Sequence, residues 1–272
     1  MPTSPPYLPP LDQLVALGDP TEIGEDWPDY PAMGIAAEHV PELIRMARDR
    51  DMLKADAETP EGWAGLHAWR ALGQLRAPSA AVPLLRLMVR EADEDNDWAM
   101  EEIPVVLGMI GPPALEPLQE MLPLLAREDE WSVTAAVGSA LVKVAKHFPD
   151  TRDAVVAALA RQLESARQQD ATTNAFLVSN LLSLSAVEAA AVMEAAFAGE
   201  EVDEAVVGDW EDVQISLGLR TERSTPRRRI DFGLPKDFLG RQPPRSAPKP
   251  PTKTKQQRKA EKAARKRNRK KR

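Results

Sequence analysis

The sequence has no cysteine and few aromatic residues. Among its 272 residues, only 5% are Phe, Trp or Tyr. A chain without cysteine forms no disulfide and offers no thiolate to a metal or a substrate. Hydrophobic residues make up 43% of the chain, which suffices for a core. That core must consist largely of Ala, Leu and Val.

Long hydrophobic runs are also missing. The N-terminal stretch MPTSPPYLPPLDQL has neither the basic start nor the unbroken apolar segment of a secretory signal. The most apolar later stretch, residues 186–198, contains Glu188 and Glu194 and is too short to cross a bilayer. We therefore expect a soluble, cytoplasmic protein, and the lack of cysteine is consistent with a reducing compartment.

The common catalytic and phosphate-binding motifs are absent. The sequence contains no G-x-S-x-G, no G-x-x-x-x-G-K-S/T and no G-x-G-x-x-G. His39, His67 and His147 are far apart, and none has a second histidine at the spacing of metal ligands. We expect these histidines on helix surfaces or at helix caps. The sequence thus predicts no enzyme, no cofactor and no metal site.

One acidic stretch, EADEDNDW, resembles the start of a calcium-binding loop. Asp93, Asp95 and Asp97 alternate as such a loop requires, but its sixth position is Trp98 and its twelfth is Pro104. Calcium loops need glycine and glutamate at those two places. We favour a loop between repeats that caps the next helix, and a divalent-ion site is the alternative.

The net charge of -7 conceals two segments of opposite sign. Residues 220–272 contain 21 Lys/Arg and four acidic residues, a charge of about +17, which leaves about -24 on residues 1–219. Seven prolines and few apolar residues occupy positions 220–252. Such a segment cannot bury enough apolar surface to offset its ordering entropy. We predict a Pro-rich linker at 220–252 and a disordered basic tail at 253–272.

The acidic part of the chain contains a repeat. Its three copies are GIAAEHVPELIRMARD (34–49), LGQLRAPSAAVPLLRLMVRE (72–91) and LGMIGPPALEPLQEMLPLLARE (107–128). Pro41, Pro83 and Pro117 share one position, at spacings of 42 and 34 residues. Proline is tolerated in the first turn of a helix, where its missing N–H has no intrahelical partner. Each proline therefore marks the start of a helix.

A second helical pattern precedes each of the later two prolines, at residues 61–75 and 97–111. Gly73 and Gly108 lie near the ends of these patterns, where glycine relieves close packing or begins the exit from a helix. Further pairs of patterns follow at 131–148 with 150–169 and at 171–185 with 187–200, and a short helix at 208–219 closes the series. No alternating β pattern is present, so we predict an all-α fold.

Three tryptophans mark the same early position in successive first helices. Trp63, Trp98 and Trp131 are spaced by 35 and 33 residues. We interpret them as packing contacts between neighbouring pairs, and a groove for a peptide or a flat cofactor is the alternative. Trp69 and Trp210 lie outside this series and are better candidates for an interface.

The helix, the Gly-containing turn, the Pro-started second helix and the period of 34 to 42 residues resemble HEAT-like repeats, the short bacterial kind also found in phycobilisome lyases. The resemblance implies an α-solenoid at residues 30–219, after an N-terminal extension at 1–29. It also implies that the second helices line the concave face, the usual binding face. No catalytic residue carries over. The candidate partner-binding residues are Glu42, Arg45, Arg86, Arg90, Glu116, Gln119 and Arg161.

The basic tail predicts salt-sensitive binding of RNA or DNA with little sequence preference, because many cations neutralise phosphates and release counterions. No aromatic residue is interleaved for base stacking. The alternatives are an acidic protein, the acidic body itself, an inert solubilising extension and, without an amphipathic face to support it, an anionic membrane. The candidate nucleic-acid-binding residues are Arg258, Lys259, Lys262, Arg265, Lys266, Arg267, Arg269, Lys270, Lys271 and Arg272.

The leading hypothesis is a non-enzymatic scaffold that holds a protein partner on the helical array while the tail attaches to nucleic acid or nucleoprotein. One alternative is an enzyme like the HEAT-like lyases or HEAT-like DNA glycosylases, using the repeat groove. Another is a structural interaction module with an inert tail. Richness in Ala, Arg and Pro favours a GC-rich bacterial source. The partner and the oligomeric state stay open at this stage.

Overall fold

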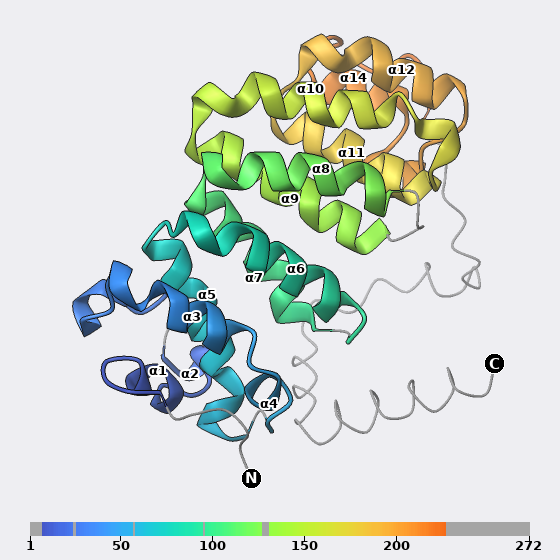
Figure 1. Ribbon diagram of the computed structural model, residues 1–272. Helices are drawn as coiled ribbons and strands as arrows, with labels where there is room; N and C mark the ends of the chain where they lie inside the picture. Colours follow the sequence, from blue (N-terminus) through green and yellow to red (C-terminus); the bar gives the residue numbers. More distant parts are fainter. Residues whose placement is uncertain (1–6, 24–25, 57, 95, 127–130, 227–272) are drawn as a thin grey trace, which may run out of the picture. The chain divides into compact units, whose positions relative to one another are not determined.

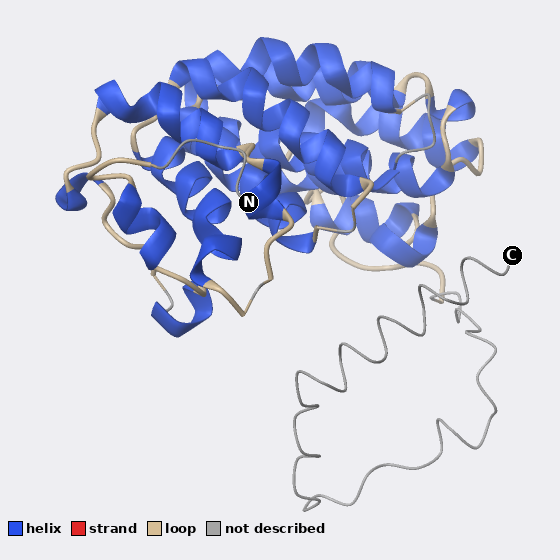
Figure 2. Cartoon of the chain, turned by 60° about the horizontal axis from the view of Figure 1, so that its bottom comes forward, coloured by secondary structure: helices blue, strands red, loops and turns tan. Residues whose placement is uncertain are grey.

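A computed structural model describes residues 7–23, 26–56, 58–94, 96–126 and 131–226. The chain divides into two units, Met1–Arg227 and Arg228–Arg272, and every described residue belongs to the first. Within the described ranges all regular structure is helical and no strand forms (Figure 2). The predicted all-α class is therefore confirmed for this part of the chain.

The helices are short and follow one another closely along the chain (Figure 1). The α-helices are Asp12–Ala16 (α1), Pro20–Ile23 (α2), Val40–Ala47 (α3), Arg50–Leu53 (α4), Ala64–Gln74 (α5), Ala81–Ala92 (α6), Asp97–Ile110 (α7), Leu115–Leu125 (α8), Trp131–His147 (α9), Arg152–Leu163 (α10), Ala171–Ser183 (α11), Ala190–Ala198 (α12), Glu204–Val207 (α13) and Trp210–Ser216 (α14). The 3-10 helices are Pro31–Met33 (η1), Ala37–His39 (η2), Pro60–Trp63 (η3), Pro78–Ala80 (η4), Pro112–Ala114 (η5), Pro149–Thr151 (η6), Ala166–Gln168 (η7) and Val187–Ala189 (η8).

Alternate helices pack into two rows. The first helices of the predicted pairs, α5, α7, α9 and α11, contact one another in that order, and so do the second helices α3, α6, α8, α10 and α12. Each second helix also packs on the first helix of the following pair, as α6 does on α7 and α8 on α9 (Figure 1). Helices that follow each other in the sequence thus bury their apolar faces against their neighbours in both rows.

Prolines set the start of the second helices. Pro83 and Pro117 occupy the third positions of α6 and α8, and Pro41 is the second residue of α3. The prediction that these prolines begin helices is therefore confirmed. A 3-10 turn precedes each second helix, and η4 and η5 begin with Pro78 and Pro112. Proline suits this position because its fixed φ favours a helical turn and its missing N–H has no partner there.

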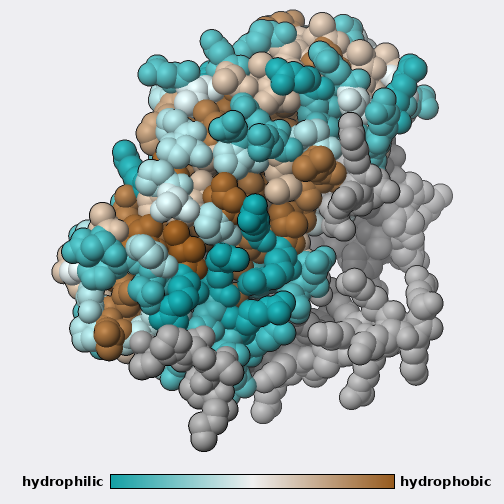
Figure 3. All heavy atoms as spheres, viewed as in Figure 1, coloured by the Kyte–Doolittle hydropathy of each residue, from teal (hydrophilic) through white to brown (hydrophobic). Residues whose placement is uncertain are grey.

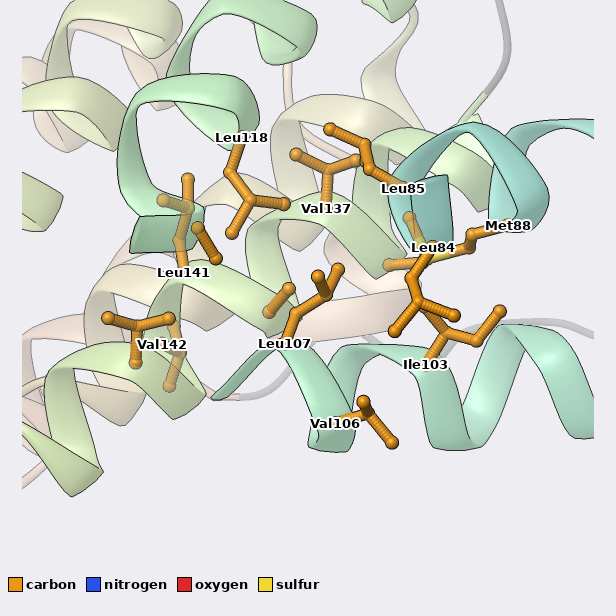
Figure 4. Close-up of a cluster of buried hydrophobic side chains, with 14 of the residues drawn as sticks. Leu84, Leu85, Met88, Ile103, Val106, Leu107, Leu118, Val137, Leu141 and Val142 are labelled. Carbon is orange, nitrogen blue, oxygen red and sulfur yellow. The ribbon is translucent and has the colours of Figure 1, made fainter. Parts of the chain in front are cut away.

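The core lies between the two rows of helices. Leu84 and Met88 of α6 meet Ile103 and Leu107 of α7 and Val137 of α9, and all five side chains are fully buried (Figure 4). Burying an aliphatic side chain of this size contributes about 1.5–3 kcal/mol each. Contacts between neighbouring pairs therefore supply much of the stability of the fold.

Glycines allow the first helices to approach each other closely. A Cβ on Gly108 of α7 would lie 2.5 Å from the Cβ of Lys143 on α9. A Cβ on Gly73 of α5 would lie 3.4 Å from the methyl groups of Val106 on α7. Both glycines stand inside their helices. Of the two roles predicted for them, the relief of close packing is therefore the correct one.

The tryptophan series joins successive first helices, as predicted. The rings of Trp63 and Trp98 meet edge to face, with centroids 5.7 Å apart. Trp131 stacks on Phe176 of α11 at 5.5 Å and an interplanar angle of 8°. Aromatic pairs in these geometries add to the stabilisation that burial alone gives. Trp131 nevertheless keeps 46% of its surface exposed.

The N-terminal residues cover the first pair of helices. Helix α1 buries Leu11 and Leu14 and packs against α5 and η3. Tyr30 and Ile35, which follow in the chain, are also buried. An array of stacked helices needs such a cover at its end, because its first helix would otherwise expose apolar surface to water.

Candidate partner-binding face

The exposed side of the second helices forms the candidate site, and we call it the second-helix face. On α6 this side carries Val82 and Arg86, with Val89 and Arg90 half-buried. These residues are three or four positions apart, so they form one stripe along the helix. The stripe combines two aliphatic side chains with two guanidinium groups.

Helix α8 continues this face with a different character. Glu116, Glu120 and Leu124 are exposed at intervals of four residues. Leu124 keeps 55% of its surface exposed and Val82 of α6 keeps 39%, which are large fractions for aliphatic side chains. In Figure 3, drawn from the same side as Figure 1, apolar residues gather over α6 and α8 between polar ones. Apolar groups framed by charges are typical of surfaces that bind protein.

Helix α10 extends the face with small residues. Ala154 and Ala157 are exposed beside Arg161. Their short side chains allow a partner to approach the backbone of this helix closely. The second-helix face is therefore basic and aliphatic on α6, acidic and aliphatic on α8, and carries alanines beside an arginine on α10.

The predicted partner-binding residues all lie on second helices, but few of them contact one another. Glu42 and Arg45 of α3 form an ion pair of 2.7 Å, and the Arg45 guanidinium also lies 3.9 Å from the ring centroid of Tyr7. Arg90 pairs with its neighbour Glu91 at 3.0 Å. Both of these arginines are thus engaged within the chain.

The other predicted residues differ in their availability. The Nε2 group of Gln119 donates to the carbonyl oxygen of Ala154 at 3.4 Å, which links α8 to α10. Arg86, Glu116 and Arg161 are exposed and form no ion pair with another described residue. These three side chains are the predicted residues best placed to meet a partner.

Sequence reasoning missed the aliphatic part of the face. Val82 and Leu124 both belong to helices that contain more apolar residues than one buried stripe requires, AVPLLRLMVREA and LEPLQEMLPLL. A surplus of apolar residues over the number needed for one buried stripe was the available signal. It indicates that some of these residues remain outside the core.

The three histidines have structural roles. His39 Nδ1 accepts a hydrogen bond from the Ala36 N–H at 3.0 Å, and His147 Nδ1 donates to the Lys143 carbonyl at 2.8 Å on the helix surface. These two agree with the prediction. His67 does not, because it is fully buried where the N-terminal residues cover α5.

His67 is held by two hydrogen bonds. Its Nδ1 lies 2.8 Å from the Tyr30 hydroxyl, and its Nε2 lies 2.9 Å from the Gly18 carbonyl oxygen. The carbonyl requires a donor at Nε2, so in the neutral ring Nδ1 accepts from the tyrosine. Burial lowers the pKa of His67 because it disfavours the charged form. The ring therefore ties the N-terminal segment to α5 as a neutral group.

Next to this histidine, a buried ion pair joins α5 to α7. The Nε of Arg70 donates to Oε2 of Glu102 at 2.8 Å, and the Trp69 indole donates to the same oxygen at 3.2 Å. The ring of Trp27 lies 4.9 Å from the Arg70 guanidinium. Trp69 is only 1% exposed, so the prediction that it belongs to an interface is wrong. Its indole fills the core and satisfies a buried carboxylate.

The acidic stretch EADEDNDW runs from the last residues of α6 to the first residues of α7. Asn96 caps α7 by accepting from the Ala99 N–H at 3.3 Å, and its amide donates to Glu91 at 2.9 Å. Asp97 lies in the first turn of α7, where its negative charge interacts favourably with the helix dipole. The cap is thus Asn96, and Asp95 lies outside the described residues. Over the described ranges, no three His, Asp or Glu side chains come together as metal ligands.

Comparisons with known protein families, with curated proteins and with solved structures find no match for this chain. In the part that the structure describes, no helix combines the length and the apolar character needed to cross a membrane. The candidate nucleic-acid-binding residues between Arg258 and Arg272 lie outside the described residues. The second-helix face is therefore the candidate site for which geometry is defined.

Proposed function

We propose that the protein is a non-enzymatic scaffold. Residues 30–219 form an α-solenoid of the HEAT-like type, and its second-helix face binds a protein partner. Two rows of sequentially packed helices and the 3-10 turn before each second helix support this reading. Stacked helix pairs of this kind create extended surfaces on which other proteins bind.

The exposed stripes of α6 and α8 are the observation that carries the proposal. Val82 and Leu124 present aliphatic surface to water, and Arg86 and Glu116 stand beside them without ion-pair partners in the described chain. Apolar centres framed by charged groups supply affinity through burial and specificity through charge. Alanines on α10 leave room for the partner to extend toward the C-terminal pairs.

The basic tail at 253–272 supplies the second activity, attachment to nucleic acid or nucleoprotein. Thirteen Lys/Arg stand between residues 249 and 272, whereas residues 1–219 are strongly acidic. Cations at this density bind phosphates through counterion release, whatever the base sequence. The acidic body disfavours nucleic acid along its own surface, which leaves the tail as the attachment point.

The state of the buried ionisable groups supports a function without catalysis. Arg70, Glu102 and His67 are each engaged in hydrogen bonds with other residues of the chain. General acid, base or nucleophilic catalysis requires a group that can reach a substrate. These three groups instead join the N-terminal segment, α5 and α7 to one another.

Affinity purification with a nuclease step tests the proposal. The full chain and a chain ending at Pro226 are each used as bait, with and without nuclease. Array partners are expected with both baits and to resist nuclease. Tail partners are expected only with the full chain and to disappear on nuclease treatment. Identical recovery by the two baits would contradict the role of the tail.

A surface variant tests the role of the second-helix face. Val82→Glu combined with Leu124→Glu places charge on the aliphatic part of the face and is expected to abolish recovery of the array partners. Lys146→Glu on the exposed surface of α9 is the matched control, since it also adds negative charge but lies on a first helix. Equal recovery with both variants would show that partners bind elsewhere.

A further inference from the structure

We propose that residues 220–225 form a charge-sensitive clasp, which holds the chain against α14 and opens when negative charge is added at Ser224 or Thr225. The clasp is the segment from Arg220 to Thr225 together with Asp209, Glu211 and Asp212. These three carboxylates lie at the start of α14. The clasp is the first part of the predicted linker, which continues toward the basic tail.

Arg223 is the centre of the clasp. Its Nη1 lies 2.8 Å from an oxygen of Asp209 and 2.8 Å from an oxygen of Asp212, and its Nη2 reaches the second oxygen of Asp209 at 2.5 Å. This arrangement is the two-pronged pairing of a guanidinium with a carboxylate, which has strong directional preference. The Arg223 side chain is 17% exposed, so it lies largely covered against α14.

Glu211 accepts hydrogen bonds from the rest of the segment. The N–H groups of Ser224 and Thr225 both donate to its Oε2 at 3.1 Å, and the Thr225 hydroxyl donates to the same oxygen at 3.0 Å. The Ser224 hydroxyl and Arg220 both donate to Oε1. The hydrogen bond from Ser224 is the main cause of a lowered pKa for Glu211, about 2. One carboxylate thus fixes both hydroxyls in place.

Helix α14 does not depend on the clasp for its own position. Val213 is fully buried and Leu217 nearly so, and Trp210 packs against Phe197 of α12. Asp209 also caps the helix by accepting from the Asp212 N–H at 3.1 Å. Opening the clasp therefore leaves α14 anchored in the core, which allows the segment to move without loss of the fold.

The charges of the clasp explain its sensitivity. The described part of the clasp brings three carboxylates together with two guanidinium groups. An anion placed on Thr225 would lie within about a hydrogen-bond length of Glu211 and would repel it. Ser224 and Thr225 are exposed residues, and their hydroxyls become free to react whenever their hydrogen bonds to Glu211 break. Individual ion pairs near the surface contribute little, so one added charge suffices to shift the balance.

The closed clasp has two consequences for the chain beyond it. Arg220 and Arg223 are withheld from other anions while they are paired with α14. The six residues of the clasp, about 20 Å of extended chain, are also removed from the linker. Opening would release both the two charges and the extra length.

Limited trypsin digestion of the full chain, followed by mass spectrometry, tests the clasp. Trypsin must insert an arginine side chain into its own pocket, so cleavage after Arg220 and Arg223 requires an open clasp. In the unmodified protein, cleavage after Arg227 to Arg229 is expected first, with residues 220 and 223 protected. Thr225→Glu is expected to speed cleavage after Arg223 by about tenfold or more, because proteolysis follows the population of the open form.

One further variant and two controls separate loss of the ion pairs from other effects. Asp209→Asn with Asp212→Asn removes two carboxylates that hold Arg223 but keeps a good helix cap at position 209. This variant is expected to open the clasp. Thr225→Val removes one hydroxyl without adding charge, and Glu222→Gln alters an exposed carboxylate outside the clasp. Both of these controls are expected to keep the protection.

The outcomes that would overturn the proposal are specific. If trypsin cleaves the unmodified protein after Arg223 as fast as it cleaves after residues 227 to 229, the clasp does not hold the chain. If the double asparagine variant stays protected, its ion pairs are not responsible. If Thr225→Val opens the segment as much as Thr225→Glu does, the clasp responds to the hydroxyl and not to charge.

Discussion

Arg70 of α5 and Glu102 of α7 form an ion pair inside the protein. Their side chains are only 7% and 11% exposed, and the two guanidinium nitrogens that point at Glu102 engage both of its oxygens. The pair connects two successive first helices at the place where the N-terminal segment covers them. A pair at such depth fixes how the helices sit against each other, because either charge alone would be costly to bury.

Removal of one partner of this pair is expected to be strongly destabilising. Glu102→Ala leaves the Arg70 charge buried without compensation and should lower the free energy of unfolding by about 3–5 kcal/mol. Glu101→Ala, at the exposed neighbouring position, should change it by less than about 0.5 kcal/mol. Urea unfolding of both variants measures the difference. Similar values for the two would show that the pair does not stabilise the fold.

Close contact between α7 and α9 at Gly108 gives a second prediction. Gly108→Ala would press a methyl group against Lys143 next to its backbone and should destabilise the protein by about 1–3 kcal/mol. Gly138→Ala meets the amide end of Asn180, which can rotate away, and reaches Leu159 only at ordinary van der Waals distance, so it should be nearly neutral. Thermal unfolding distinguishes them. Equal midpoints for the two variants would contradict the packing described for α7.

The buried histidine predicts a loss of stability in mild acid. The folded protein holds His67 neutral, so its pKa lies below the value of about 6.5 in the unfolded chain. As the pH falls below about 6.5, the unfolded chain binds a proton that the folded chain does not, and the free energy of unfolding decreases.

Urea unfolding between pH 8 and pH 5 measures this effect. His67→Gln is the comparison, since it keeps a side chain that can donate and accept but does not titrate. His39 and His147 are present in both proteins, so the difference between the two pH profiles isolates His67. Parallel profiles would mean that His67 does not contribute to the pH dependence.

Features with local signals were predictable from the sequence. Pro83 and Pro117 mark helix starts because the cost of a proline depends on the turn in which it stands. The spacing of Trp63 and Trp98 indicated a contact between neighbouring pairs, and their rings do meet. Such features depend on residues close in the sequence or on a repeat that brings equivalent positions together.

Features that depend on distant residues were not predictable. His67 and Trp69 are buried by contacts with Tyr30 and Glu102, more than thirty residues away in either direction. Arg223 stands in a segment whose composition indicates a linker, and only its meeting with Asp209 shows that the chain is held there. None of these contacts leaves a pattern in the neighbouring sequence.

The candidate face was predicted in part. The resemblance to HEAT-like repeats made Arg86 and Glu116 candidates for the binding face, and both side chains are exposed. Val82 and Leu124 were not among the candidates, although they keep 39% and 55% of their surface exposed. Only the packing of neighbouring helices decides which of these residues stay outside.

The proposal that the basic tail, and not the helical array, binds nucleic acid is tested most directly by measuring nucleic-acid binding. Fluorescence anisotropy measures the affinity of the full chain, and of a chain ending at Pro226, for labelled single-stranded RNA and duplex DNA at several salt concentrations. Circular dichroism checks that both chains are equally helical. We predict that only the full chain binds, with little sequence preference, and that its affinity falls by about a thousandfold or more between 50 and 200 mM salt. Equal binding by the two chains would contradict the account.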